Sequence, residues 1–355
     1  MGTIWYWLVA FMLMAYVVLD GFDLGAGVAQ LLIAKSDQDK QLILRSIGPV
    51  WDGNEVWLIA GGGKLYFAFP LVYASAFSGF YLALTMVLWL LILRGIGIEL
   101  RMHIAARVWH EFFDGCFALS SALLAILFGA ALANVIRGVP IGEDGYFFLP
   151  LWTDWRVGPN PGILDWYTVL GGVIGLVALT VHGALYIALK TEGELSTRAA
   201  GLGRRVWGGL VILTAIGLPA TLRVRPAMLT NYAAYPIAFL IPALVVASLA
   251  GMLVFSRMRR ERDAFLSSCA YLALMLTGAA VGLFPTLLPS STDPAYDITV
   301  ATALTGNYAA SVGLIWWSFG ILIAIGYFVF VYRMFGGKVR LAGGGTVSNR
   351  RPLYT

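Results

Sequence analysis

The sequence predicts an all-α membrane protein, a polytopic bundle of about eight transmembrane helices. Hydrophobic residues make up 59% of the 355 residues and charged residues only 12%, and the mean hydropathy is +0.81. A soluble domain carries about 25% charged residues, so this composition excludes an ordinary soluble enzyme. An even number of spans also allows two pseudo-symmetric four-helix halves, although no internal repeat is evident.

Each predicted span is a run of about 20 mainly apolar residues, the length that crosses a bilayer as a helix. The runs cover residues 4–33, 71–93, 112–135, 163–189, 206–222, 236–255, 264–284 and 313–334. The apolar segment 56–69 is shorter, and three glycines and Lys64 interrupt it. We expect it to be a helical or re-entrant piece packed against protein, because irregular backbone is tolerated at membrane depth only there.

The Lys and Arg residues predict the orientation of the bundle. Most of them fall in the loops after every second span, and loops rich in these residues face the cytoplasm. Both termini are therefore predicted to be cytoplasmic, with residues 35–69, 136–162 and 285–312 on the outer side. The net charge of +5 reflects this topology and does not indicate nucleic-acid binding. Residues 1–335 are expected to form the transmembrane domain, and residues 336–355 a flexible basic tail.

Two pairs of acidic residues lie in or beside the apolar runs: Asp20 with Asp23, and Asp52 with Glu55. A carboxylate at membrane depth costs about 2.5–3.5 kcal/mol on insertion scales, so it usually faces a protein interior or a water-filled path. Residues three apart share one face of a helix, and each pair is a candidate for proton transfer or for buried charge pairing. The alternatives are a hydrated helix end for the first pair and a favourable place near a helix N-terminus for the second.

Other polar residues near the spans leave two interpretations open. Arg94 ends one span and Asp114 begins the next. They belong either to a topology-setting loop with a surface ion pair, or to a site where Asp114 pairs with an arginine against a partner protein. Trp51 is expected to anchor the chain at the membrane interface, as tryptophan commonly does.

The histidines and cysteines indicate no cofactor site in this chain. His182 lies in the middle of a span, but a haem held by two axial side chains needs a second ligand at the same depth. No second ligand stands out, so we expect a hydrogen-bonded interior histidine. Cys116 and Cys269 form no Cys-x-x-Cys pair, and we find no phosphate-binding loop or dinucleotide fingerprint.

Several motifs resemble those of one known family. Residues 18–25 read VLDGFDLG and residues 48–58 read GPVWDGNEVWL, and both resemble signature segments of subunit II of cytochrome bd-type quinol oxidases. Further matches lie in residues 69–81, 190–195, 284–291 and 332–336. The resemblance runs in order along nearly the whole chain, which makes it specific.

The resemblance implies a respiratory complex in the cytoplasmic membrane of bacteria or archaea that oxidises quinol and reduces dioxygen to water. Its haems, of b and d type or of b type alone, are expected in the partner subunit I. This chain is then expected to carry no catalytic residue and to bind no haem or metal, while stabilising subunit I and adding polar groups to a proton pathway. Further expected partners are quinone, lipid and a small accessory transmembrane subunit.

The resemblance also assigns roles to residues. Asp52 is the first candidate for the proton pathway, followed by Glu55 and Asp20, although the family pattern varies between Glu and Gln at the position of Glu55. Structural support of the haem region is expected from Asp23, Trp51, Arg94 and Asp114. The alternative function is a proton-coupled secondary transporter, because such proteins also combine intramembrane acids with glycine-interrupted helices.

Overall fold

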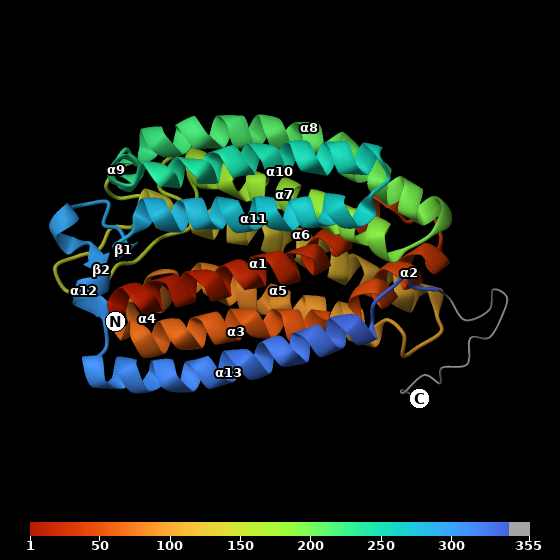
Figure 1. Cartoon of the computed structure of the whole chain (residues 1–355), viewed down its shortest axis with the longest axis horizontal. Coiled ribbons are helices and arrows are strands. Elements are labelled where there is room, and N and C mark those ends of the chain that lie inside the picture. Colours follow the sequence, from red (N-terminus) through yellow and green to blue (C-terminus); the bar gives the residue numbers. More distant parts are fainter. Residues whose placement is uncertain (341–355) are drawn as a thin grey trace.

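The computed structural model describes residues 1–340 as an elongated bundle in which the long helices run side by side (Figure 1). Within residues 1–340, eight helices are long and apolar enough to cross a membrane, which confirms the predicted helical membrane fold. They are α1 (Gly2–Ile33), α5 (Tyr81–Leu100), α6 (Arg107–Arg137), α7 (Trp166–Lys190), α8 (Gly193–Val224), α10 (Leu240–Arg257) with the preceding 3₁₀ turn η1 (Pro236–Phe239), α11 (Glu261–Leu283) and α13 (Asn307–Met334).

The remaining elements are short, apart from α3. They are α2 (Asp37–Ile47), α3 (Trp51–Ala68), α4 (Pro70–Gly79), α9 (Met228–Ala234), the 3₁₀ turn η2 (Pro294–Tyr296), α12 (Val300–Ala303), and the strands β1 (Thr286–Leu288) and β2 (Ile298–Thr299). The strands pair antiparallel at one end of the bundle. The predicted basic tail lies largely outside the described residues; its first part, residues 336–340, packs back on the end of α7.

Helix α3 runs the length of the bundle, which corrects the expected short piece at residues 56–69. Its first turn lies beside Gly95 near the end of α5, and at its other end Ala68 O accepts a hydrogen bond from Thr305 N at 2.9 Å. Pro70 then starts α4, and the chain turns at Phe80 into α5, so the predicted span 71–93 is two helices. The sequence did not predict this crossing, because the three glycines suggested a break in the helix. In the structure, α3 continues through them.

The path of α3 also places the N-terminus and the end of α13 at opposite ends of the bundle, whereas the eight predicted spans would place them at the same end. Helices α1 and α13 start together, because Trp5 Nε1 donates to Ala310 O at 3.1 Å. Helix α13 ends at the far side, where Val339 N donates to Lys190 O at the end of α7. The N-terminus and the end of α13 therefore lie at opposite ends of the bundle (Figure 1).

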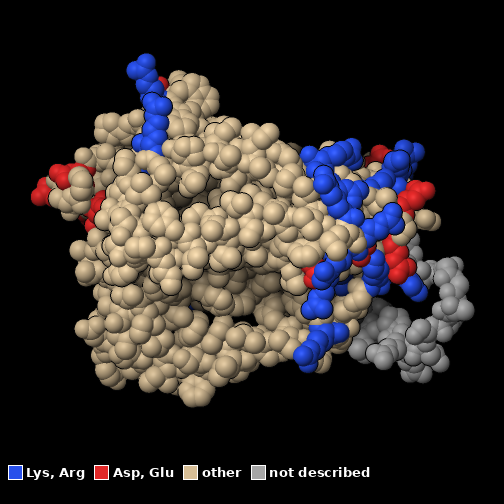
Figure 2. Space-filling model, turned by 45° about the horizontal axis from the view of Figure 1, so that its top comes forward, with Lys and Arg blue, Asp and Glu red and all other residues tan. Residues whose placement is uncertain are grey.

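The two ends of the bundle differ in charge. One, here called the basic end, holds α2, the ends of α1, α7 and α13 and most of the Lys and Arg side chains, which Figure 2 shows gathered there. The other, the loop end, holds residues 138–165 and the β1–β2 pair. The surface between them in Figure 2 is almost free of charge, as expected of a belt in contact with lipid.

Helix α1 forms the centre of the bundle, and every residue from Asp20 to Gln30 is buried. It approaches α7 closely at Gly25 and Gly183. A Cβ built on Gly25 would lie 1.9 Å from Leu179 O and 2.7 Å from Gly183 N. Small residues allow this contact between two backbones, which fixes the depth and rotation of the acidic residues on α1.

Candidate functional site: a buried acid–arginine cluster

Asp20 and Arg94 form an ion pair in the middle of the bundle, and neither side chain is exposed. Arg94 Nη1 donates to Asp20 Oδ2 at 2.9 Å and Nη2 donates to Oδ1 at 2.5 Å. The guanidinium also lies 3.8 Å from Glu55 Oε2 and 5.7 Å from the ring centre of Trp51. A bidentate arginine–carboxylate pair is the strong form of this interaction, and it joins α1, α3 and α5.

Asp23 lies one helical turn beyond Asp20 but pairs differently. Its Oδ2 accepts a hydrogen bond from Asn54 Nδ2 at 2.8 Å, and Asn54 Oδ1 accepts one from the Tyr332 hydroxyl at 2.9 Å. The second carboxylate oxygen of Asp23 makes no hydrogen bond within the described chain. Asp23 is therefore held by a neutral amide, and α13 is connected to the cluster through Asn54.

The cluster carries more negative than positive groups. Asp20 and Glu55 lie within 4 Å of one guanidinium, that of Arg94, whereas the hydrogen-bond partner of Asp23 is Asn54. Asp20 and Asp23 are fully buried, whereas the Glu55 side chain is 22% exposed. Glu55 is thus the cluster carboxylate that reaches toward the surface of the chain.

Asp52 lies one helical turn before Glu55 on α3 but outside this cluster. It is exposed and shares one face of α3 with Val56, Ile59 and Tyr66, three apolar side chains that are 51%, 72% and 62% exposed. Their spacing follows the helical repeat. Because apolar residues occur on every side of α3, its rotation could not be read from the sequence.

Comparison with known proteins decides the family. A family model described as cytochrome bd terminal oxidase subunit II matches residues 1–335. The chain belongs to the cytochrome bd terminal oxidase subunit II family. It is therefore a subunit of a quinol-oxidising complex, and the transporter alternative is not favoured.

Individual members of the family support this assignment. The chain is 31% identical to the probable cytochrome oxidase subunit 2 of Haemophilus influenzae, over 99% of this chain and 98% of that protein. It is 31% identical to the cytochrome bd-I ubiquinol oxidase subunit 2 of Escherichia coli strain K12, over 87% of each protein. A chain in the structure of bd oxidase from Geobacillus thermodenitrificans has the same fold, with a TM-score of 0.74, 17% identity and coverage of 94% of this chain and 98% of that one.

Asp114 of this subunit II chain pairs with Arg101, the residue that follows α5. Arg101 donates to both oxygens of Asp114, at 2.5 and 3.2 Å, and to Asp37 at 2.5 Å, while Lys40 lies 3.0 Å from Asp114. Partial burial favours neutral Asp37, but the hydrogen bond and charge of Arg101 outweigh it and lower the pKa of Asp37. This network ties α2 to α5 and α6 at the basic end, apart from the Asp20–Arg94 cluster.

His182, the histidine in the middle of a span, already has a partner on each of its ring nitrogens. His182 Nδ1 is 2.7 Å from Ser268 Oγ and Nε2 is 2.9 Å from Val18 O, so both ring nitrogens are engaged. The ring also stacks on Phe265 with centres 5.0 Å apart. Among residues 1–340, no group of three His, Cys, Asp or Glu is placed to hold a metal ion. His182 is the hydrogen-bonded interior histidine that the sequence indicates.

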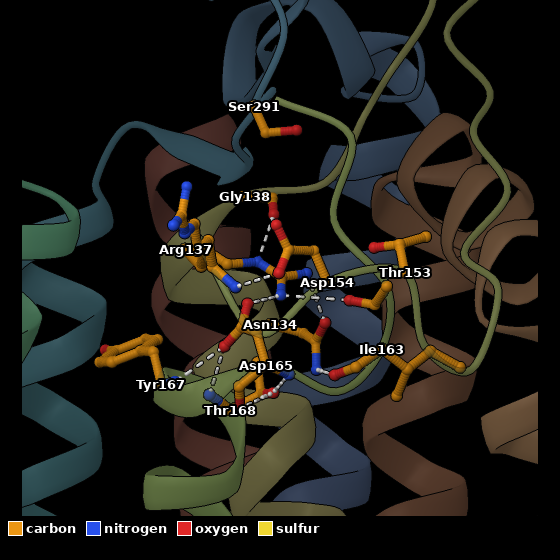
Figure 3. A network of polar contacts seen from close by, with 12 residues as sticks. Asn134, Arg137, Gly138, Thr153, Asp154, Ile163, Asp165, Tyr167, Thr168 and Ser291 are labelled. Atoms are coloured by element: carbon orange, nitrogen blue, oxygen red, sulfur yellow. Dashed lines mark hydrogen bonds and ion pairs between the residues drawn. The ribbon is translucent and has the colours of Figure 1, made fainter. Parts of the chain in front are cut away.

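A further buried ion pair, between Arg137 and Asp165, lies at the loop end and was not singled out from the sequence (Figure 3). Arg137 Nη2 donates to Asn134 Oδ1 at 2.7 Å, and Asp165 Oδ1 caps α7 by accepting from Tyr167 N and Thr168 N. The pair therefore clamps the loop between α6 and α7. From the sequence, Arg137 at the end of a span indicated only the orientation of the chain. Its contact with Asp165, 28 residues later, depends on the fold.

Proposed function

We propose that this chain is the haem-free partner of subunit I, and that its buried Asp20–Arg94 cluster holds together the helices against which subunit I assembles. The observation that carries the proposal is a fully buried, bidentate ion pair in a chain whose mid-span histidine is hydrogen-bonded on both ring nitrogens. In this proposal the haems, b and d or b alone, belong to subunit I, and quinol is the substrate of the whole complex.

The proposed orientation places the basic end in the cytoplasm. Lys35, Lys40 and Arg45 lie there with the later basic loops, so the charge asymmetry is stronger than the sequence alone suggests. Loops rich in Lys and Arg remain on the cytoplasmic side. The N-terminus then faces outward and the end of α13 faces the cytoplasm, in the bacterial cytoplasmic membrane.

The exposed face of α3 is the surface that we assign to subunit I. Asp52 stands on this face together with Val56, Ile59 and Tyr66. Such an apolar face suits lipid or protein, but a carboxylate in contact with lipid is costly. A partner that supplies polar contacts to Asp52 removes this cost, and subunit I is the partner that the family implies. A small accessory subunit and lipid cover other faces.

The same face suggests where protons pass. Oxygen reduction consumes protons at a buried site, and carboxylates with neighbouring polar groups can carry them. Asp52 and Glu55 lie one turn apart on α3, with Glu55 reaching into the cluster and Asp52 toward the proposed partner. We assign these two residues to the proton pathway. Asp20, held by two hydrogen bonds from Arg94, takes a structural role together with Asp23.

A photo-cross-linking experiment tests the docking face. A photoreactive amino acid replaces Ile59 on α3 or, as the control, Ile212 on α8, which is 61% exposed and lies on another side of the bundle (Figure 1). The proposal expects irradiation of native membranes to join the chain to the larger haem-bearing subunit from position 59 and not from 212. Cross-linking from 212 alone would overturn the assigned face.

A further inference from the structure

A cavity opens at the basic end, between three parts of the chain that are distant in sequence. Its volume is about 190 Å³, well above the roughly 30 Å³ that one water occupies in the liquid. Arg45 and Pro49 line it from the connection between α2 and α3, Lys190 from the end of α7, and Tyr332 and Phe335 from the end of α13. The cavity can therefore hold a group larger than a single water molecule.

The cavity is positively charged and has no internal counter-ion. Its lining contains Arg45 and Lys190 but no carboxylate. Within residues 1–340, Arg45 makes no side-chain hydrogen bond or ion pair, whereas Arg198 at the same end pairs with Asp39 at 2.6 Å. Lys190 Nζ donates to Phe335 O at 2.7 Å, and an ammonium has three donors. Both cations thus keep donors for an anionic ligand.

One wall of the cavity is built by the segment after α13. Val339 lines the cavity, and its N–H donates to Lys190 O at 2.8 Å. The residues on either side are held by ion pairs, Lys338 with Glu261 at 3.6 Å and Arg340 with Glu192 at 3.1 Å. The cavity therefore has a side closed by protein, which distinguishes it from a loose group of surface cations.

The position and the mixed lining indicate the kind of anion. The cavity lies where the long apolar helices end, which is the depth of lipid headgroups. Pro49, Val50, Phe335 and Val339 add apolar wall beside the cations. A free inorganic anion gains nothing from that wall, whereas a phosphodiester attached to glycerol and acyl chains gains from both parts. Basic pockets of this kind bind acidic headgroups.

We propose that this cavity binds the phosphate group of one acidic phospholipid, with Arg45 and Lys190 as its cationic partners. The lipid would join the α2–α3 connection to the ends of α7 and α13. The proposal is independent of the proton role assigned to Asp52 and Glu55.

Native mass spectrometry of the whole oxidase complex tests the proposal. The complex is stripped of lipid in mild detergent and titrated with phosphatidylglycerol, phosphatidylcholine or inorganic phosphate. We expect one phosphatidylglycerol to bind in preference to phosphatidylcholine. The double variant Arg45→Gln/Lys190→Gln should weaken this binding about tenfold or more, since each basic residue near a headgroup contributes about 1 kcal/mol.

Two variants control for structural damage. Arg205→Gln removes an exposed arginine at the same end and should leave binding unchanged, while Arg45→Lys keeps the charge and should retain most of it. The haem spectrum of each variant verifies that the complex is assembled. Equal binding of phosphatidylglycerol by the wild type and the double variant would overturn the proposal. So would inorganic phosphate that displaces the lipid at comparable concentration, or equal affinity for phosphatidylcholine.

Discussion

Arg94→Met is the change that most sharply tests the role of the buried cluster. It keeps an unbranched stem of similar length but removes the guanidinium that donates twice to Asp20. Both side chains are fully buried, and removing one partner of a buried pair costs about 3–5 kcal/mol. Such a loss is a large part of a typical stability of about 5–15 kcal/mol. The abundance of the complex should therefore fall several-fold.

The assay compares Arg94→Met with the double variant Asp20→Asn/Arg94→Met. Neutralising Asp20 as well removes the fully buried carboxylate that Arg94→Met leaves without its partner, so the double variant should lose less stability than the single one. The amount of complex in membranes, the haem difference spectrum and the thermal midpoint in detergent should all recover in the double variant. Arg205→Met serves as the exposed control. Wild-type values in Arg94→Met, or a double variant as damaged as the single one, would refute this reasoning.

Three other charged groups give contrasting predictions. Asp52→Asn should lower quinol-driven oxygen uptake more than complex abundance, because the side chain is exposed on α3; equal loss of both would leave only an assembly role. Arg137→Met leaves the buried carboxylate of Asp165 without its partner, at a cost of about 3–5 kcal/mol. Limited proteolysis should therefore cut the loop after α6 sooner, while the haem spectrum persists. Loss of the haem spectrum before the loop is cut would contradict this. Arg101 lowers the pKa of Asp37, so their interaction stabilises fully at neutral pH and is lost as pH falls from the ordinary carboxylate range through the lowered pKa. In Asp37→Asn, the thermal midpoint should depend less steeply on pH in the acid range. An unchanged pH dependence would show that Asp37 does not contribute to acid sensitivity.

The fold class could be predicted because membrane spans depend on composition over about 20 residues. The path of α3 could not, because glycines interrupt its apolar sequence and α4 follows directly at Phe69–Pro70. An α-helix continues through glycine when neighbouring helices hold it, and that information is tertiary. The arrangement of the chain ends differs from the prediction for the same reason, since one missed crossing changes which end of the bundle holds residues 35–47 relative to the later helices.

The site could be predicted only as a set of residues of interest. The spacing of Asp20 and Asp23 indicated a shared helix face, and both are indeed buried on α1. Their different partners, Arg94 for one and Asn54 for the other, come from α5 and α3 and depend on how these helices rotate in the bundle. Asn54 lies inside a recognised motif, but a neutral amide between two charged residues does not by itself indicate a buried contact with another helix.

Purification of the tagged chain from its native membranes tests the central claim most directly. The purified material is analysed by a reduced-minus-oxidised haem spectrum and by quinol-driven oxygen uptake. As subunit II, the chain should bring with it a larger haem-bearing subunit and quinol oxidase activity. A chain that remains alone in gentle detergent, without haem and without oxygen uptake, would contradict the account.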